Sequence, residues 1–387
     1  MRSVAAATIG LLLALSAAAC GDDDAQEPSA SPTRSSAGAE STASDEPDAA
    51  AAESDPPADL AATDVSCPTS LEPNPFEDDL YEDIEYPVNA LAGGHAFLYL
   101  GQNGDNDDGQ YFRLYDAAAH TGTEDLSLGI DGGYEAYGLD GDDTGFAVLS
   151  ADSENDQLVL SFVDFDGTVA WTAPIAGTGE DREAVALVGG KVYVSGPHDI
   201  QVFDAASGAS LAAPAYLGPD DALLLGADPS DRFLYLLSQQ ALRDRPESYD
   251  VRVVDAESGA AVADLTGLHS PGFAADGRLL DYSGDDGVHL IGLDGSVTDL
   301  SAFDPEGEAA INVCGDFVYS VSADEGDSPV LEIGNLSDGT LVASQELAYE
   351  MFGGEYLSGD SINVDDGVVM VVGRNDDEYV SVLSFTA

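Results

Sequence analysis

Carboxylate side chains are the groups in this chain with the most capacity for chemistry. Asp and Glu supply 74 of its 387 residues, against 11 Lys and Arg, for a formal net charge of −63. Clustered carboxylate oxygens suit hard cations such as Ca²⁺. The closest match to a calcium loop is 103–109 (NGDNDDG), where Asp105 and Asp107 are the candidate ligands. Its glycine comes one place late and no glutamate follows at the required distance, so a solvated acidic loop is the favoured interpretation.

The other residue types used in catalysis do not form a pattern. The histidines are scattered without metal-ligand spacing and are expected to be loop or packing residues: His95, His120, His198, His269 and His289. The chain has no Gly-x-Ser-x-Gly elbow, no phosphate loop and no Gly-x-Gly-x-x-Gly after a strand. Carboxylates are too common for a glycosidase-like pair to be singled out. We therefore assign no catalytic or cofactor-binding residue, and expect no cofactor apart from the Ca²⁺ alternative.

The acidic balance also limits the partners. After Ser66 the chain has 62 of the 74 acidic residues and 9 of the 11 basic ones, a net charge near −53. Nucleic acid is excluded, because binding phosphates needs clustered Lys and Arg. Adaptation to salt or simple solubility explains such a surface. The alternative is a surface that attracts cations or basic partners.

The first twenty residues predict export. Residues 4–15 are apolar but too short to span a bilayer. The sequence AAAC at 17–20 resembles a bacterial lipobox, whose cysteine, here Cys20, is lipidated. An ordinary secretory signal with an accidental cysteine is the alternative. A lipidated Cys20 would anchor the protein to the outer face of the bacterial cytoplasmic membrane.

Residues 21–66 form the predicted tether, and residues 67–387 the folded domain. The tether is rich in Ala, Ser, Pro, Asp and Glu, and has almost no large apolar residue before Leu60. Such a segment cannot bury enough surface to offset its ordering entropy, so an extended acidic linker is expected. In the domain, Cys67 and Cys314 are the two cysteines left after Cys20. An exported chain favours their pairing, with two buried free thiols as the alternative.

Acidic, Gly-containing turns recur along the domain between strand-like apolar runs. Their first residues lie 48, 40, 51, 39 and 43 positions apart: 116, 164, 204, 255, 294 and 337. One four-stranded propeller blade needs about 40–50 residues. The clearest copy reads as strands 184–188, 191–195 and 200–204, with Gly189 and Gly190 in a tight hairpin.

The period predicts an all-β propeller of seven blades, each of four antiparallel strands. The seventh blade runs out of chain after 379–385, so an N-terminal strand must close the ring. The alternating segment 81–86 (YEDIEY) is the predicted closing strand. A β-sandwich is the competing architecture, but it would not need a period near 45.

Two copies of the repeat resemble the pyrroloquinoline-quinone-type β-propellers: VYVS with VFDAASGASL (192–195 and 202–211), and VVDAESGAAV (253–262). The resemblance implies a turn followed by an outer-strand Trp that docks onto the neighbouring blade. The segment 166–171 (DGTVAW) keeps that pattern once, since Trp171 is the only Trp in the chain. The resemblance bears on the fold and does not imply an activity.

The leading functional hypothesis is a non-catalytic, membrane-tethered extracytoplasmic propeller that binds or scaffolds a partner protein. A quinoprotein-like oxidoreductase or another propeller enzyme is the first alternative. The quinone enzymes of the resembling family usually have repeated Trp motifs and often adjacent cysteines near the cofactor, and this chain has neither. A divalent-cation-binding envelope protein is the second alternative.

Overall fold

The computed structural model describes most of the domain. The described residues are 66–75, 88–100, 111–116, 121–122, 126, 128, 134–152, 157–175, 184–195, 200–217, 222–227, 232–238, 248–282, 287–304, 309–322, 328–347, 362–365, 367–374 and 380–386. The predicted signal, Cys20 and nearly all of the tether lie outside them, as do Asp105 and Asp107. No helix in the described ranges is long and apolar enough to cross a membrane.

The described residues form seven four-stranded antiparallel sheets. The first three are β2 (Val88–Ala92), β3 (His95–Leu100), β4 (Tyr111–Asp116) and β5 (Thr121–Gly122); β6 (Tyr134–Gly141), β7 (Gly145–Asp152), β8 (Gln157–Asp164) and β9 (Val169–Pro174); and β10 (Ala184–Val188), β11 (Lys191–Ser195), β12 (Ile200–Asp204) and β13 (Ser210–Leu211). The fourth is β14 (Ala222–Ala227), β15 (Phe233–Ser238), β16 (Tyr249–Asp255) and β17 (Ala261–Leu268).

The fifth sheet is β18 (Pro271–Phe273), β19 (Leu279–Tyr282), β20 (Val288–Ile291) and β21 (Val297–Asp299), followed by the short 3₁₀ helix η5 (Ser301–Phe303). The sixth is β22 (Ala310–Cys314), β23 (Phe317–Ser322), β24 (Val330–Asn335) and β25 (Leu341–Glu346). The seventh combines β26 (Ile362–Asp365), β27 (Val368–Arg374) and β28 (Val380–Thr386) with β1 (Glu72–Pro75) from the other end of the chain.

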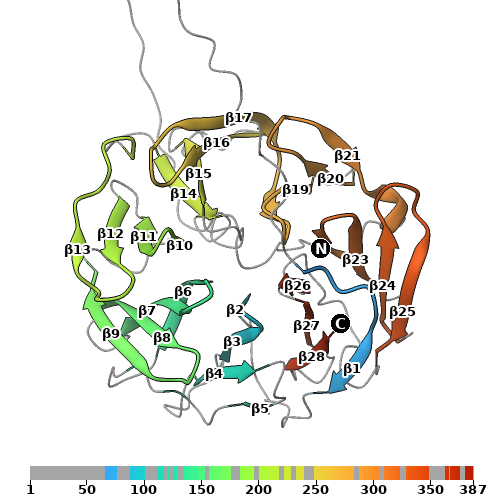
Figure 1. Ribbon diagram of the computed structural model, residues 1–387, viewed down its shortest axis with the longest axis horizontal. Helices are drawn as coiled ribbons and strands as arrows, with labels where there is room; N and C mark the ends of the chain where they lie inside the picture. The colour runs from blue at the N-terminus through green and yellow to red at the C-terminus, as the bar shows by residue number, and fades with distance from the viewer. Residues whose placement is uncertain are drawn as a thin grey trace, which may run out of the picture.

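The sheets are arranged as wedges around a common centre (Figure 1), with the first strand of a sheet toward the centre and the fourth at the rim. This is an all-β β-propeller, so the predicted propeller fold is confirmed and the sandwich alternative is wrong. The seventh and first sheets meet through β26 and β2, which lie next to each other.

Tight two-glycine hairpins connect the first two strands of the first and third sheets. In the third sheet Val188 pairs with Lys191, which leaves only Gly189 and Gly190 in the turn. Their φ angles are 59° and 67°, in the left-handed region that a two-residue hairpin requires and that glycine adopts without a steric penalty.

The core lies between the sheets. Six clusters of buried apolar side chains each bring together residues of consecutive sheets. Between the first and second sheets, Phe97 and Phe146 are fully buried, with ring centroids 5.4 Å apart. Each sheet therefore needs its neighbours to bury its apolar faces, and the ring is the arrangement that gives every sheet two neighbours.

An N-terminal strand completes the seventh sheet, but the prediction that 81–86 forms it is wrong. β1 occupies the outer position, where Glu72 pairs with Thr386 and Pro75 with Leu383. Residues 81–86 lie outside the described residues. The sequence EPNP shows no apolar alternation, and its prolines cannot donate to a ladder, which restricts such a strand to a sheet edge. Its position follows from the chain just before it, which is attached to the sixth and seventh sheets.

Candidate functional site

The outer-strand tryptophan docks onto the next sheet. Trp171 Nε1 donates a 2.6 Å hydrogen bond to the carbonyl of Ala205, in the turn before β13. Its ring stacks on Phe162 and lies against Gly208, where an added Cβ would come within 2.6 Å of the indole. Gly208 also has a φ of 68°, so this position requires glycine twice over. The contact that the resemblance implies at Trp171 is therefore present.

A tyrosine makes the same contact at the next junction, which the sequence analysis missed. Tyr216 donates a 2.7 Å hydrogen bond from its hydroxyl to the carbonyl of Ala256, and its ring covers Gly259. Ala256 and Gly259 hold the same places in their turn as Ala205 and Gly208 in theirs. Burial raises the pKa of the Tyr216 hydroxyl. The sequence did contain a signal for this contact. In both cases an aromatic residue precedes the turn alanine whose carbonyl it contacts, by 34 positions for Trp171 and by 40 for Tyr216.

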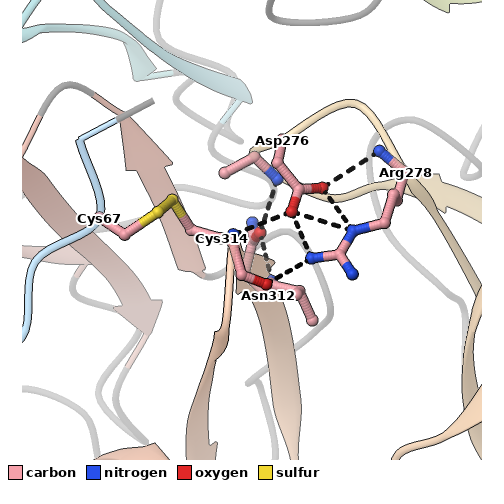
Figure 2. A network of polar contacts seen from close by, with 8 residues as sticks. Cys67, Asp276, Arg278, Asn312 and Cys314 are labelled. Carbon is pink, nitrogen blue, oxygen red and sulfur yellow. Dashed lines mark hydrogen bonds and ion pairs between the residues drawn. A yellow bond between two sulfur atoms is a disulfide. The ribbon is translucent and has the colours of Figure 1, made fainter. Parts of the chain in front are cut away.

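A polar network ties the fifth sheet to the sixth beside the disulfide (Figure 2). Asp276 is buried and pairs with Arg278, whose guanidinium also donates to the carbonyl of Gly315 at 2.6 Å. The amide of Gly315 donates back to Asp276 at 2.9 Å. Asn312 accepts from the amide of Ala275 and donates to the carbonyl of Ile362 in the seventh sheet. This network links three consecutive sheets, the fifth, the sixth and the seventh.

The predicted disulfide is confirmed and fastens the N-terminal arm to this network. Cys67 and Cys314 are bonded with their Cα atoms 5.7 Å apart. On either side, the amide of Gly367 donates to the carbonyl of Ser66 at 2.7 Å, and the Tyr319 hydroxyl donates to the carbonyl of Pro68 at 2.7 Å. We call residues 66–75 the clasp, because they join the sixth and seventh sheets.

A separate cavity of about 320 Å³ lies between β17 of the fourth sheet and the fifth sheet. Its polar lining includes His269, Asp281 and His289, and we call it the His–Asp cavity. Asp281 is 5% exposed and accepts hydrogen bonds at Oδ1 from the amides of His269 and Ser270, at 2.7 and 2.8 Å. Its Oδ2 lies 3.4 Å from Nδ1 of His269.

His289 extends this group across the sheet. It lies directly opposite Asp281 of β19 on one side and Asp299 of β21 on the other. Directly opposed residues of antiparallel strands project to the same face, so the imidazole lies between two carboxylates. Hydrogen bonds from Ser301, and to a small extent the neighbouring His289, hold the pKa of Asp299 below its usual value.

The cavity has part of what acid–base chemistry needs. A carboxylate beside Nδ1 can hold an imidazole in one orientation and leave Nε2 free to exchange a proton. Among the described residues, however, no hydroxyl or thiol hydrogen-bonds to His269 or His289. The described part of the chain also contains no group of three His, Cys, Asp or Glu placed to hold a metal ion.

The other candidates have ordinary positions or lie outside the description. His95 contacts the carbonyl of Gly93 and stacks on Phe165 with ring centroids 4.1 Å apart, which is the expected packing role. His120 and His198 fall outside the described residues. His269 and His289 were also expected to be packing or loop residues, and the structure instead brings them together around Asp281. Their separation of 20 positions in the sequence gave no motif.

No protein-family model matches this chain, and no curated protein matches it either. Solved structures do resemble it. A prolyl endopeptidase structure has a TM-score of 0.50 at 16% identity, over 79% of this chain and 47% of the other, so this chain spans about half of that protein. The likeness shows the fold alone.

Two further structures are similar at lower scores. The β-propeller domain of the Trilobed protease from Pyrococcus furiosus, with an open velcro topology, has a TM-score of 0.48 at 11% identity, over 79% of this chain and 94% of that one. YCF48 bound to D1 peptide has a TM-score of 0.48 at 14% identity, over 83% of this chain and 100% of that one.

Proposed function

We propose that this protein is a non-catalytic, membrane-tethered extracytoplasmic propeller that binds or scaffolds a partner protein. The observation that carries the proposal is the clasp. Three kinds of contact fix the clasp to the ring: a disulfide, hydrogen bonds that the ring donates to two main-chain carbonyls of the clasp, and strand pairing. An attachment of this kind suits a rigid body that is held at a surface by its N-terminal end.

The disulfide also supports export. Persistent disulfides form in oxidising compartments and are rare in the cytosol. Lipidation of Cys20 would then anchor the chain to the outer face of the cytoplasmic membrane. A flexible Gly-rich coil of 46 residues would have a root-mean-square length of about 35–40 Å, and the extended acidic tether expected here would reach further. A partner in the membrane or close to it lies within that distance.

The charge favours a partner with a basic surface. A domain with a net charge near −53 attracts cationic surfaces and repels nucleic acid. Electrostatic complementarity of this kind raises the rate of encounter and falls with ionic strength.

Crosslinking on intact cells tests the proposal. A photo-crosslinking residue is placed at exposed rim positions, Val297 and Leu341, of the full chain, in wild type and in Cys20→Ser. Recovery of the same partner from both positions, reduced when Cys20 is replaced, supports a tethered scaffold. Recovery of no repeated protein from either position contradicts it. Incorporation of labelled fatty acid into wild type but not Cys20→Ser reports the anchor independently.

The His269–Asp281 pair favours one alternative, an enzyme that uses a general base. Turnover of ester, peptide or phosphoester panels that is lost in His269→Gln would support a hydrolase. A quinoprotein-like oxidoreductase is tested by absorbance and dye reduction after addition of the quinone and Ca²⁺. Saturable heat on titration with Ca²⁺ would support the divalent-cation-binding alternative.

A further inference from the structure

The His–Asp cavity contains a buried carboxylate whose charge is only partly compensated. Asp281 Oδ1 receives two main-chain N–H groups, but the contact of Oδ2 with His269 is 3.4 Å, long for a charge-assisted hydrogen bond. None of the described residues that line the cavity is Lys or Arg. Buried carboxylates are rarely left without a cationic partner, because desolvation of the charge is costly.

Asp276, in the same sheet, is a buried carboxylate with a structural role, and its partners can be compared with those of Asp281. Both aspartates are 5% exposed. Asp276 has Arg278 two residues away in a direct ion pair, and the amide of Gly315 on the same carboxylate. Asp281 has instead a 3.4 Å contact with an imidazole and an open cavity. No Lys or Arg of the described lining pairs with Asp281, and the cavity leaves space beside it in which a cation could bind.

The remaining walls indicate what the cation would be attached to. Leu265, Leu268 and Ile291 are buried and line the cavity, and Val297 lines it from the exposed rim. Apolar walls of this kind suit a short alkyl chain. Asp264 also lines the cavity and adds negative charge at the solvent side, although Arg252 pairs with it at 2.8 Å where both side chains are 62% exposed.

We propose that the His–Asp cavity binds an alkylammonium or alkylguanidinium group. Its N–H donors reach Asp281 Oδ2 and the imidazoles of His269 and His289, and its alkyl chain packs on Leu265 and Ile291. The volume of about 320 Å³ is at the lower end of ligand sites, which restricts the ligand to a small group. A free amine and a Lys or Arg side chain of a peptide share this chemistry. The inference does not depend on the tethered scaffold.

Calorimetry and proton NMR on the full chain test the inference, with n-butylguanidinium as the probe at pH 8.0 in 150 mM NaCl. We expect saturable binding with one site per chain and shifts of the His269 and His289 ring signals. Neutral n-butyramide and anionic butyrate are matched in size and should bind at least tenfold more weakly. An equal response to all three, or no saturable signal from the cation, overturns the proposal.

Variants locate the site. Asp281→Asn keeps Oδ1 for the two amides and removes the charge, and should weaken binding at least tenfold. Asp143→Asn removes the same charge from an exposed turn and should leave binding unchanged. If Asp281→Asn fails to fold, His289→Gln and the wild-type ring shifts decide instead. Unchanged affinity in the folded variants places binding elsewhere and rejects the site.

A peptide arm separates the two sources of the cation. The affinity of Ac-Gly-Arg-Gly-NH₂ is compared with that of n-butylguanidinium and of Ac-Gly-Gln-Gly-NH₂. Binding of the arginine peptide as tight as the free guanidinium, and lost with glutamine, assigns the cavity to a partner's side chain. Binding of the free cation alone assigns it to a small amine or guanidine.

Discussion

The hydroxyl of Tyr319 donates a 2.7 Å hydrogen bond to the carbonyl of Pro68, 251 residues away in the chain. Tyr235 holds the same third place in β15 as Tyr319 in β23, and its hydroxyl donates to the carbonyl of Gly277 in the next sheet. Pro68 therefore supplies to the sixth sheet a contact that a neighbouring sheet supplies to the fourth. The N-terminal arm completes the packing of the ring as well as its strand pairing.

Loss of the disulfide should destabilise the ring. Cys67→Ser releases a crosslink that spans 247 residues, and we expect the free energy of unfolding to fall by about 2–4 kcal/mol. Chemical denaturation followed by circular dichroism measures the change. Wild type treated with a phosphine reductant is the matched control and should behave as the variant does. Identical midpoints for oxidised and reduced wild type would show that the disulfide contributes nothing to stability.

The Tyr319 hydrogen bond should be separable from the disulfide. Tyr319→Phe removes one hydroxyl and leaves the buried Pro68 carbonyl without this donor, which should cost about 1–3 kcal/mol. Amide hydrogen exchange should also speed up in β1 and the facing part of β28. Tyr235→Phe serves as the control, because it should destabilise the fold without selectively exposing β1. Equal exchange of β1 in the two variants would contradict a role for Tyr319 in holding the arm.

A glycine that lies against a docking aromatic ring should tolerate substitution less well than a glycine in the same kind of turn without that contact. Gly208 and Gly339 both have φ of 68°, but only Gly208 lies against an aromatic ring, at 2.6 Å from an added Cβ. Gly208→Ala should therefore destabilise the protein by about 1–3 kcal/mol more than Gly339→Ala, which carries the backbone strain alone. Thermal denaturation of the two variants gives the comparison, and similar midpoints would refute the contact at Trp171.

The turn aspartates should contribute a stabilisation that is lost at low pH. Hydrogen bonds from Ser258, and secondarily the nearby Arg232, hold the pKa of Asp255 below its usual value. Because the folded pKa is lower than the unfolded one, this stabilisation is complete above about pH 4 and declines as pH falls through the folded pKa. The difference in stability between wild type and Ser258→Ala should shrink below pH 4. Carboxyl NMR titration should show the Asp255 pKa rising in the variant, and an unchanged value would refute the assignment.

Salt should stabilise the domain. With a net charge near −53, exposed carboxylates repel one another, and salt screens them over about 10 Å at 0.1 M. The melting temperature should rise between 10 mM and 1 M NaCl. Sodium chloride and potassium chloride should act alike if screening is responsible, and a flat or falling melting temperature would contradict it.

The repeat made most of the fold predictable, because each blade must bury the same apolar pattern against its neighbours. Strands 184–188, 191–195 and 200–204 match the structure residue for residue. The disulfide was predicted from the number of cysteines in the chain and from the oxidising compartment alone. The closing strand was misplaced because EPNP has neither alternation nor strand-forming residues, and its position depends on the disulfide before it. The His–Asp cavity depends on cross-strand register, which brings His289 and Asp281 together without any sequence motif.

The order of attachments in the clasp has a mechanical consequence. Cys67 precedes β1 along the chain, so in a chain tethered as proposed, tension from the N-terminal side would reach the covalent crosslink before it reached β1. The disulfide would pass that load to β22 of the sixth blade. The hydrogen bonds between β1 and β28 would therefore not be broken in sequence. Movement of the cell envelope would then displace the whole propeller as a unit and leave the pairing of β1 with β28 intact.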